Sequence, residues 1–235
     1  LATISGVSRI AAAGSRAAAI KDGQVYVWGS GTRTPTLLGI SDAQEIALGA
    51  DIGAVLKSDG TVWTWGNNSV GQLGKGAAGG SSSTPVQVVG VGGTGTLTGA
   101  TRIAVGTDAM YALMADGTIA AWGSNANGRL GNGSTTNSPY PVAVSGGETG
   151  TQKFTGADAI AAGNGYAAAL RSDGTVWGWG KNNAYQLGLG TTKEITAPAQ
   201  MPGGVTGSEH LQGIEQISLG QTRSLAVTGN GDVLI

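Results

Sequence analysis

The sequence predicts an all-β protein built from repeated four-stranded antiparallel sheets. The first observation is a recurring segment, which reads DGTVWTWGNNSVGQLG at 59–74, DGTIAAWGSNANGRLG at 116–131 and DGTVWGWGKNNAYQLG at 173–188. The second is its spacing, because these copies are 57 residues apart, and abbreviated copies begin at Asp22 and Asn230. The third is composition: 44 of 235 residues are glycine and 11% are charged, which is typical of a turn-rich folded chain and not of a disordered one.

Each copy contains four segments with strand patterns, taken here in chain order. The first alternates and ends in glycine, as in RIAVG at 102–106. The second is an apolar run of small residues, such as AAAL at 167–170, that leads into Asp-Gly. The third is the Trp-Gly segment, such as TVWGWG at 175–180, in which both tryptophans share one face. The fourth begins near proline, as in TPVQVV at 84–89, which suits an edge strand.

The Asp-Gly pairs predict tight hairpins between the second and third strands. We expect type I′ turns there, which need positive φ at both central residues. Asp22, Asp59, Asp116 and Asp173 are interpreted as turn residues that bond to their own hairpin, and not as metal ligands. The Gly/Thr-rich segments that end each long copy are expected to be loops; they span 90–99, 146–156 and 203–213.

A single four-stranded meander leaves apolar faces that it cannot cover, and radial stacking of such sheets covers them. The sequence therefore predicts a β-propeller of four-stranded antiparallel blades in a single domain. We number its units 1 to 5, at approximately 7–42, 43–99, 100–156, 157–213 and 214–235, the last being incomplete. One tryptophan of each third strand is expected at an equivalent position packed between blades; these are Trp28, Trp65, Trp122 and Trp179.

The joint recurrence of I-A-x-G, D-G-T-V-W-x-W-G, Q-L-G and T/S-P-V resembles the repeats of the regulator of chromosome condensation family, over essentially the whole chain. The resemblance implies a seven-bladed propeller in a complete member, so about four and a half units look like part of a larger chain or assembly. Two features depart from the family: the units are longer, and a common histidine is replaced by Ile52, Ala109, Tyr166 and Arg223. Members include a secreted inhibitor of β-lactamases and a nuclear exchange factor for a small GTPase.

Composition and motifs argue against several kinds of chemistry. A net charge of −1 offers no footprint for nucleic acid, and no apolar run approaches the ~20 residues that membrane insertion requires. The chain has no cysteine and one histidine, His210, so neither a catalytic triad nor a histidine-based metal site assembles. We expect a protein that is not an enzyme and that uses no cofactor and no metal.

Candidate binding residues come from the positions that the repeat does not dictate. In a meander, the loops between strands one and two and between strands three and four emerge on the same rim, where the units differ most. The opposite rim holds the nearly invariant Asp-Gly turns, although its Gly/Thr segments make a competing site. Aromatic and arginine side chains are frequent anchors of interfaces. The candidates on the first rim are Tyr166, Tyr185, Arg129, Arg223, Val70 and Ile52.

Two function classes follow. The leading hypothesis is a non-enzymatic binding or adhesive scaffold that recognises a protein or glycan through this rim. Low charge, abundant Gly, Ser, Thr and Asn, and the lack of cysteine suit an extracellular or cell-surface bacterial protein. The alternative is a regulatory protein, such as a secreted enzyme inhibitor or an exchange-factor-like protein, that acts through the same rim.

Overall fold

The computed structural model describes residues 4–146, 152–203 and 209–234. Its regular structure consists of strands, apart from the short 3-10 turn η1 (Ala126–Gly128). Unit 1 forms β1 (Val7–Ala13), β2 (Arg16–Lys21), β3 (Gln24–Gly29) and β4 (Thr32–Leu37). Unit 2 forms β5 (Ala43–Leu48), β6 (Ile52–Lys57), β7 (Val62–Asn67) and β8 (Ser81–Gln87). Unit 3 forms β9 (Ala100–Val105), β10 (Ala109–Met114), β11 (Ile119–Gly123) and β12 (Ser138–Ala143).

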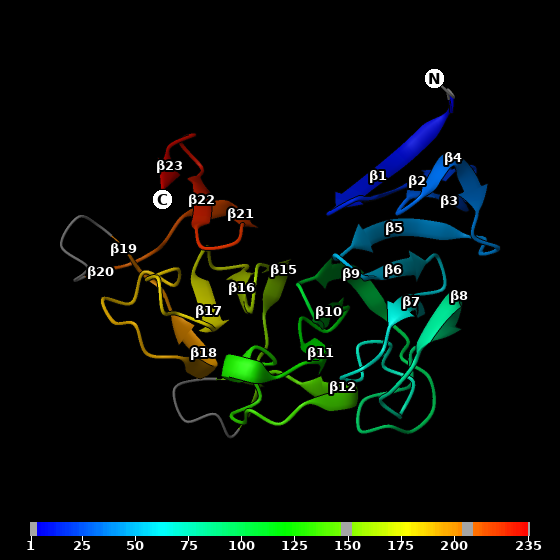
Figure 1. Ribbon diagram of the computed structural model, residues 1–235. Helices are drawn as coiled ribbons and strands as arrows, with labels where there is room; N and C mark the ends of the chain where they lie inside the picture. The colour runs from blue at the N-terminus through cyan, green and yellow to red at the C-terminus, as the bar shows by residue number, and fades with distance from the viewer. Residues whose placement is uncertain (1–3, 147–151, 204–208, 235) are drawn as a thin grey trace.

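Unit 4 forms β15 (Ala157–Ala162), β16 (Tyr166–Arg171), β17 (Val176–Gly180) and β18 (Ile195–Gln200). Unit 5 forms β21 (Ile214–Leu219), β22 (Ser224–Thr228) and β23 (Val233–Leu234). The main sheet of each unit is an antiparallel meander in chain order, with four strands in units 1 to 4 and three in the described part of unit 5. Figure 1 shows these sheets following one another around an arc, with β1 and β23 at its two ends. The predicted all-β fold of stacked four-stranded blades is confirmed.

The tryptophans of the third strands occupy equivalent strand positions, as predicted, but Trp28 is half-buried and lies in none of the core clusters of the described residues. In the ladder between the second and third strands, Trp28 lies opposite Ala17, Trp65 opposite Gly53, Trp122 opposite Met110 and Trp179 opposite Ala167. Each partner is the second residue of its strand, so every indole lies at the rim end of its sheet.

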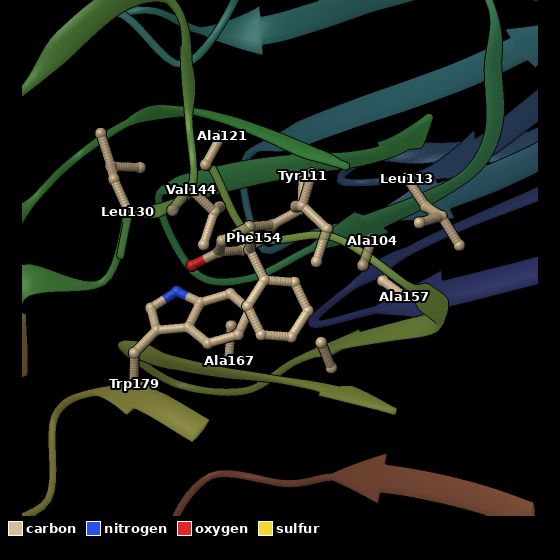
Figure 2. Close-up of a cluster of buried hydrophobic side chains, with 13 residues drawn as sticks. Ala104, Tyr111, Leu113, Ala121, Leu130, Val144, Phe154, Ala157, Ala167 and Trp179 are labelled. Carbon is tan, nitrogen blue, oxygen red and sulfur yellow. The ribbon is translucent and has the colours of Figure 1, made fainter. Parts of the chain in front are cut away.

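The hydrophobic core is divided into clusters that lie between neighbouring units. The cluster between units 3 and 4 joins Tyr111 and Leu113 of unit 3 to Trp179 of unit 4. Figure 2 shows the Trp179 and Phe154 rings beside one another in this cluster, and their centroids are 6.3 Å apart. Each sheet is therefore stabilised mainly by apolar area that it buries against the next sheet.

The hairpin turns differ from the expected type. Among the described turns between second and third strands, only that of Asp22 and Gly23 has positive φ at both central residues, 51° and 72°. In units 2 to 4 the turn is longer, and its glycine alone is left-handed, as at Gly60 with φ 76°. The Asp59 carboxylate Oδ1 there accepts hydrogen bonds from the Thr61 amide at 2.9 Å and the Thr61 hydroxyl at 2.6 Å. The structural role of these aspartates is confirmed, whereas the type I′ prediction was wrong for the three long units.

The Gly/Thr-rich segments are more than loops. Two of them contain two-residue ladders, β13 (Ser145–Gly146) with β14 (Gln152–Lys153), and β19 (Pro202–Gly203) with β20 (Glu209–His210). Each segment contributes one apolar side chain to a core between units. These residues are spaced 57 positions apart: Leu97, Phe154 and Leu211. Positions 147–151 and 204–208 of these segments lie outside the described residues.

Candidate functional site

The rim formed by the loops between strands one and two and between strands three and four presents three of the predicted side chains to solvent. Tyr185 is 61% exposed. Arg223 is exposed and Arg129 is half-buried. Arg129 lies at the junction of units 3 and 4, and the other two lie at the junction of units 4 and 5. These residues form what we call the basic-aromatic rim: Arg129, Tyr185 and Arg223.

Tyr185 has an unusual backbone conformation for an aromatic residue, with φ at +58°. The equivalent residues of units 2 and 3 are Gly71 and Gly128, with φ of 88° and 72°. The left-handed conformation disfavours a residue that has a Cβ atom by roughly 1–2 kcal/mol. The amide of Tyr185 donates to the Asn182 carbonyl at 3.2 Å, as the amide of Gly128 does to Asn125 at 3.0 Å, so the loop keeps its shape despite this cost.

The two equivalent glycines have a packing reason. A Cβ atom at Gly71 would lie 2.5 Å from Cα of Pro139, and one at Gly128 would lie 2.6 Å from Cα of Thr196. Both neighbours belong to the fourth strand of the following unit. The equivalent strand of unit 5 is not among the described residues, and the Tyr185 side chain is 61% exposed in this structure.

Arg129 is held by its own loop. Its Nε donates to the Ala126 carbonyl at 2.8 Å, and its Nη2 lies 3.4 Å from the Asn127 Oδ1. The guanidinium lies beside Gly165 of unit 4, since a Cβ atom built there would be 3.2 Å from Nη2. The Lys181 side chain borders the same glycine. Arg129 and Lys181 thus bring two basic side chains to this part of the rim, where the Glu194 carboxylate accepts a hydrogen bond from Asn127.

Two predicted binding residues are corrected by the structure. Tyr166 has no exposed surface, and its hydroxyl donates to the Arg223 carbonyl of unit 5 at 2.6 Å. Ile52 is 1% exposed and belongs to the core between units 2 and 3. Both side chains point inward because they begin the second strand, whose residues are covered on both faces by neighbouring sheets. Val70 lies half-buried in the loop between β7 and β8.

The asparagines after the Trp-Gly segment hold the long rim loops together. Asn68 accepts the amide of Leu73 at 3.0 Å, and Asn125 accepts the amide of Leu130 at 2.9 Å. Asn182 repeats the bond with the amide of Leu187 at 3.0 Å. These side chains are fully buried, so they fix the loop conformation that presents the basic-aromatic rim.

Sequence reasoning missed the joint between units, which we call the indole slot. The Trp122 Nε1 donates to the Gln72 carbonyl of unit 2 at 3.0 Å, and the Trp179 Nε1 donates to the Arg129 carbonyl of unit 3 at 2.9 Å. A Cβ atom at Gly74 would lie 2.8 Å from the Trp122 indole, and one at Gly131 would lie 2.8 Å from the Trp179 indole. The Leu-Gly pair after this carbonyl thus shapes a slot for the indole of the following unit.

Between units 4 and 5 the corresponding place is a cavity of about 590 Å³. Its walls include Gln186 and Gly188, which align with the slot residues of units 2 and 3, together with apolar side chains of both units. Its lining also includes Tyr185 and Arg223 of the basic-aromatic rim. The core cluster at this junction contains aliphatic residues and no aromatic ring among the described residues.

Other kinds of site find little support. Within residues 4–146, 152–203 and 209–234, no group of three or more His, Cys, Asp or Glu side chains is placed to hold a metal ion. His210 is exposed on β20. No helix in the described part of the chain is long and apolar enough to cross a membrane.

Stacked meanders joined by indole slots define a propeller of Trp-Gly repeats. A family model described as the regulator of chromosome condensation (RCC1) repeat matches residues 59–113, 116–170 and 173–227. A second model with the same description matches 43–72 and 157–186. The matches cover more than half of the chain, which belongs to the RCC1 repeat family.

Several known proteins resemble the chain. Human E3 ubiquitin-protein ligase HERC2 is 31% identical over 209 residues, which cover 80% of this chain and 4% of that protein. The Arabidopsis thaliana ultraviolet-B receptor UVR8 is 29% identical over 84% of this chain and 42% of its own length. The chain thus spans less than half of either relative.

Solved structures show the same fold. Prp20p from Saccharomyces cerevisiae superposes with a TM-score of 0.77 and 19% identity, over 94% of this chain and 55% of that chain. Human WBSCR16 gives a TM-score of 0.78 and 21% identity, over 97% and 59% of the two chains. The structure of Prp20p is reported with its binding to Gsp1p and histones.

Proposed function

We propose that this chain is a non-catalytic protein-binding module that engages its partner through the basic-aromatic rim of Arg129, Tyr185 and Arg223. The observation that carries the proposal is Tyr185, an aromatic residue 61% exposed at a left-handed position that its repeat fills with glycine. Backbone strain of this kind clusters at functional positions. Favourable contacts between Tyr185 and a partner would offset this backbone strain.

The chemistry of the rim favours a protein partner with acidic side chains. Tyrosine and arginine are enriched among the residues that dominate binding energy. Arg129 and Lys181 place positive charge beside one junction, and Arg223 places it beside Tyr185 at the next. Electrostatic attraction of this kind speeds association and weakens with added salt.

The comparisons are consistent with this proposal without naming a partner. A regulatory role, the alternative from the sequence, is one form of it, as the relatives named as a receptor and a ubiquitin ligase illustrate. We also keep as proposals the adhesive role, glycan recognition and the bacterial cell surface or extracellular location. Labelling of intact producing cells with an antibody tests the location, and signal only after permeabilisation would exclude it.

The binding proposal is tested with variants that replace rim residues by the residues that other units carry at the same repeat positions. Arg129→Gln and Tyr185→Gly each introduce the residue found at the equivalent position of other units, so the double variant should keep the fold. The control is Arg102→Gln, an exposed arginine near the opposite end of its sheet. The three proteins are immobilised, exposed to the same extract of producing cells, and compared by quantitative mass spectrometry and by direct binding with the purified partner.

We expect a partner that wild type and Arg102→Gln bind equally, and that the double variant binds at least about tenfold more weakly. Equal retention by all three proteins would overturn the assignment of the rim. Loss of partner binding by the Arg102→Gln variant alone would place the binding site on the opposite rim. On a glycan array, Tyr185-dependent binding of a sugar would replace the protein partner with a glycan.

A further inference from the structure

An arginine packed against two aromatic rings lies at the rim of the Asp-Gly turns, opposite the basic-aromatic rim. The Arg171 guanidinium carbon is 4.7 Å from the centre of the Phe154 ring and 4.8 Å from the centre of the Trp177 ring. The two rings meet edge to face, with centroids 5.9 Å apart. Attraction between a cation and aromatic rings holds the guanidinium in one position at the junction of units 3 and 4.

Unit 2 shows how the repeat neutralises a cation at this position. Lys57 ends β6 as Arg171 ends β16, and each lies opposite the first residue of the first strand of its unit. The Lys57 Nζ lies 5.9 Å from the centre of the Trp63 ring and 3.6 Å from the Asp42 carboxylate. This contact is the one ion pair among the residues that the structure describes.

Gly156 takes the place of Asp42 in unit 4. Each of the two residues directly precedes the first strand of its unit. The Asp42 carbonyl accepts the amide of Ser58 at 2.9 Å, and the Gly156 carbonyl accepts the equivalent amide of Ser172 at 3.1 Å. Both residues have the left-handed conformation, with φ of 60° and 73°. The backbone is therefore the same in both units, and unit 4 lacks the carboxylate.

The Arg171 charge has no equivalent counterion in the described part of the chain. Its Nε is buried and has no hydrogen-bond partner there. The nearby Asp173 is engaged elsewhere, since its Oδ1 accepts the Thr175 amide at 2.9 Å and the Thr175 hydroxyl at 2.6 Å. These bonds lower the pKa of Asp173 most, and the Arg171 charge lowers it further without forming an ion pair. An added acceptor for the guanidinium is therefore favourable.

Space for such an acceptor is open beside Gly156. This residue is exposed, and a Cβ atom built on it would have no heavy atom within 4 Å. In unit 2, the Asp42 side chain reaches the cation from the equivalent backbone position. A carboxylate that arrives from solvent and lies where that side chain lies would thus meet the Arg171 guanidinium.

We propose that Arg171 anchors an aspartate or glutamate side chain of a protein partner, whose carboxylate takes the place that Asp42 fills in unit 2. The planar guanidinium matches a carboxylate with two parallel hydrogen bonds. Packing against Phe154 and Trp177 restricts the side chain before binding, so less conformational entropy is lost on association. The geometry thus adds a second contact site, on the rim of the Asp-Gly turns.

The test titrates the isotope-labelled 235-residue protein with the peptide Gly-Gly-Asp-Gly-Gly, blocked at both ends so that it carries one carboxylate. NMR follows the Arg171 Nε–H and the Trp177 Nε1–H. We expect saturable shifts of both signals, and at least about tenfold weaker binding of the matched peptide with asparagine, because a charged acceptor bonds more strongly. The Trp63 Nε1–H should not shift, since Asp42 already pairs with the cation beside that ring.

Equal binding of the two peptides, or no saturable shift with either, would overturn the proposal. Inorganic phosphate is titrated at the same ionic strength. Stronger binding of phosphate than of the aspartate peptide would overturn the carboxylate assignment.

Two protein variants localise the site. Gly156→Asp supplies the missing counterion, and its control is Gly99→Asp in unit 3, where φ is 77°, a Cβ atom also has no heavy atom within 4 Å, and the cation position holds Met114. We expect Gly156→Asp alone to shift the Arg171 signal without peptide and to weaken peptide binding by about tenfold or more. Equal effects of the two variants, or unchanged binding by Gly156→Asp, would contradict the assignment.

A third variant keeps the test decisive if Gly156→Asp unfolds. Arg171→Met introduces the residue that unit 3 carries at this position, and it should abolish the shift of the Trp177 signal caused by the aspartate peptide. Persistence of that shift would overturn the proposal. The inference does not rest on the basic-aromatic rim: the double variant Arg129→Gln and Tyr185→Gly should bind the peptide as wild type does, so either proposal can fail alone.

Discussion

The Trp179 indole nitrogen donates a hydrogen bond to the backbone carbonyl of Arg129, 2.9 Å away and 50 positions earlier in the chain. The same oxygen accepts the buried Tyr111 hydroxyl. One carbonyl at the rim thus joins two units, and the equivalent bond from Trp122 to Gln72 joins the preceding pair. These bonds use only the backbone carbonyl of Arg129, so its side chain is available for recognition.

The first prediction concerns this joint. Trp179→Phe removes the hydrogen bond and keeps most of the packing, so the free energy of unfolding should fall by about 1 kcal/mol. Trp179→Ala should cost about 3–5 kcal/mol because it leaves a cavity in the core between units 3 and 4. Urea denaturation measures both changes. Tyr140→Ala, at a residue that is 36% exposed, is the control and should cost less than about 1 kcal/mol.

The second prediction concerns the left-handed loop position. Tyr185→Gly should raise the free energy of unfolding by about 0.5–1 kcal/mol, because relief of the positive φ exceeds the entropy that glycine adds to the unfolded chain. Gly128→Ala should lower it by about 2 kcal/mol or more, since strain and a contact with Thr196 add together. Thermal melts compare the pair. A loss of stability with Tyr185→Gly would mean that the ring packs on the protein itself.

The third prediction replaces an expectation from the sequence. Tyr166 was expected to contact a partner, but its hydroxyl bonds to the Arg223 carbonyl. Tyr166→Phe should therefore cost about 1 kcal/mol of stability, while binding at the rim is unchanged. Chemical denaturation and partner affinity, measured on the same sample, separate the two roles. A stable protein with weakened binding would restore the original assignment.

The fourth prediction is a loss of stability in alkali. Burial raises the pKa of Tyr166 above its usual value of 10.0. The unfolded chain then releases this proton first, so the stability contribution is present below pH 10.0 and is lost as the pH rises above it. Between pH 9 and 11, stability should fall less steeply in Tyr166→Phe than in wild type. Parallel pH profiles would show that Tyr166 ionises normally in the fold.

The fifth prediction concerns acid. Hydrogen bonds from the following threonines lower the pKa of Asp59, Asp116 and Asp173 below 3.8. A depressed pKa contributes stability above pH 3.8 that is lost as the pH falls below it. The triple Asp→Asn variant should therefore show a smaller decrease in melting temperature between pH 5 and 2. Glu45, whose pKa is raised by burial, acts with the opposite sign and is unchanged in both proteins.

The sequence predicted the blades well because their signals are local and periodic. Alternating strands, hairpin turns and the position of Trp179 all repeat every 57 residues, so each copy supports the interpretation of the others. Phe154 and its counterparts were missed although they follow the same period, because their glycine-rich surroundings are typical of loops. Their 57-residue spacing with Leu97 and Leu211 is the signal that identifies them.

The site was harder to predict because it depends on side-chain direction and on neighbouring units. Tyr166 and Arg223 share one repeat position, yet one is buried and the other is exposed. The Tyr166 side chain bonds to unit 5, and a single repeat does not encode that neighbour.

Hydrogen exchange of the indole N–H groups, followed by NMR, tests most directly whether each unit is joined to the preceding one through its tryptophan. The account predicts slow exchange for Trp122 and Trp179, whose N–H groups are buried and bonded across units. Trp63 should exchange faster, since it is half-buried and bonds only to nearby Thr61. Exchange of Trp122 and Trp179 as fast as that of Trp63 would contradict the account.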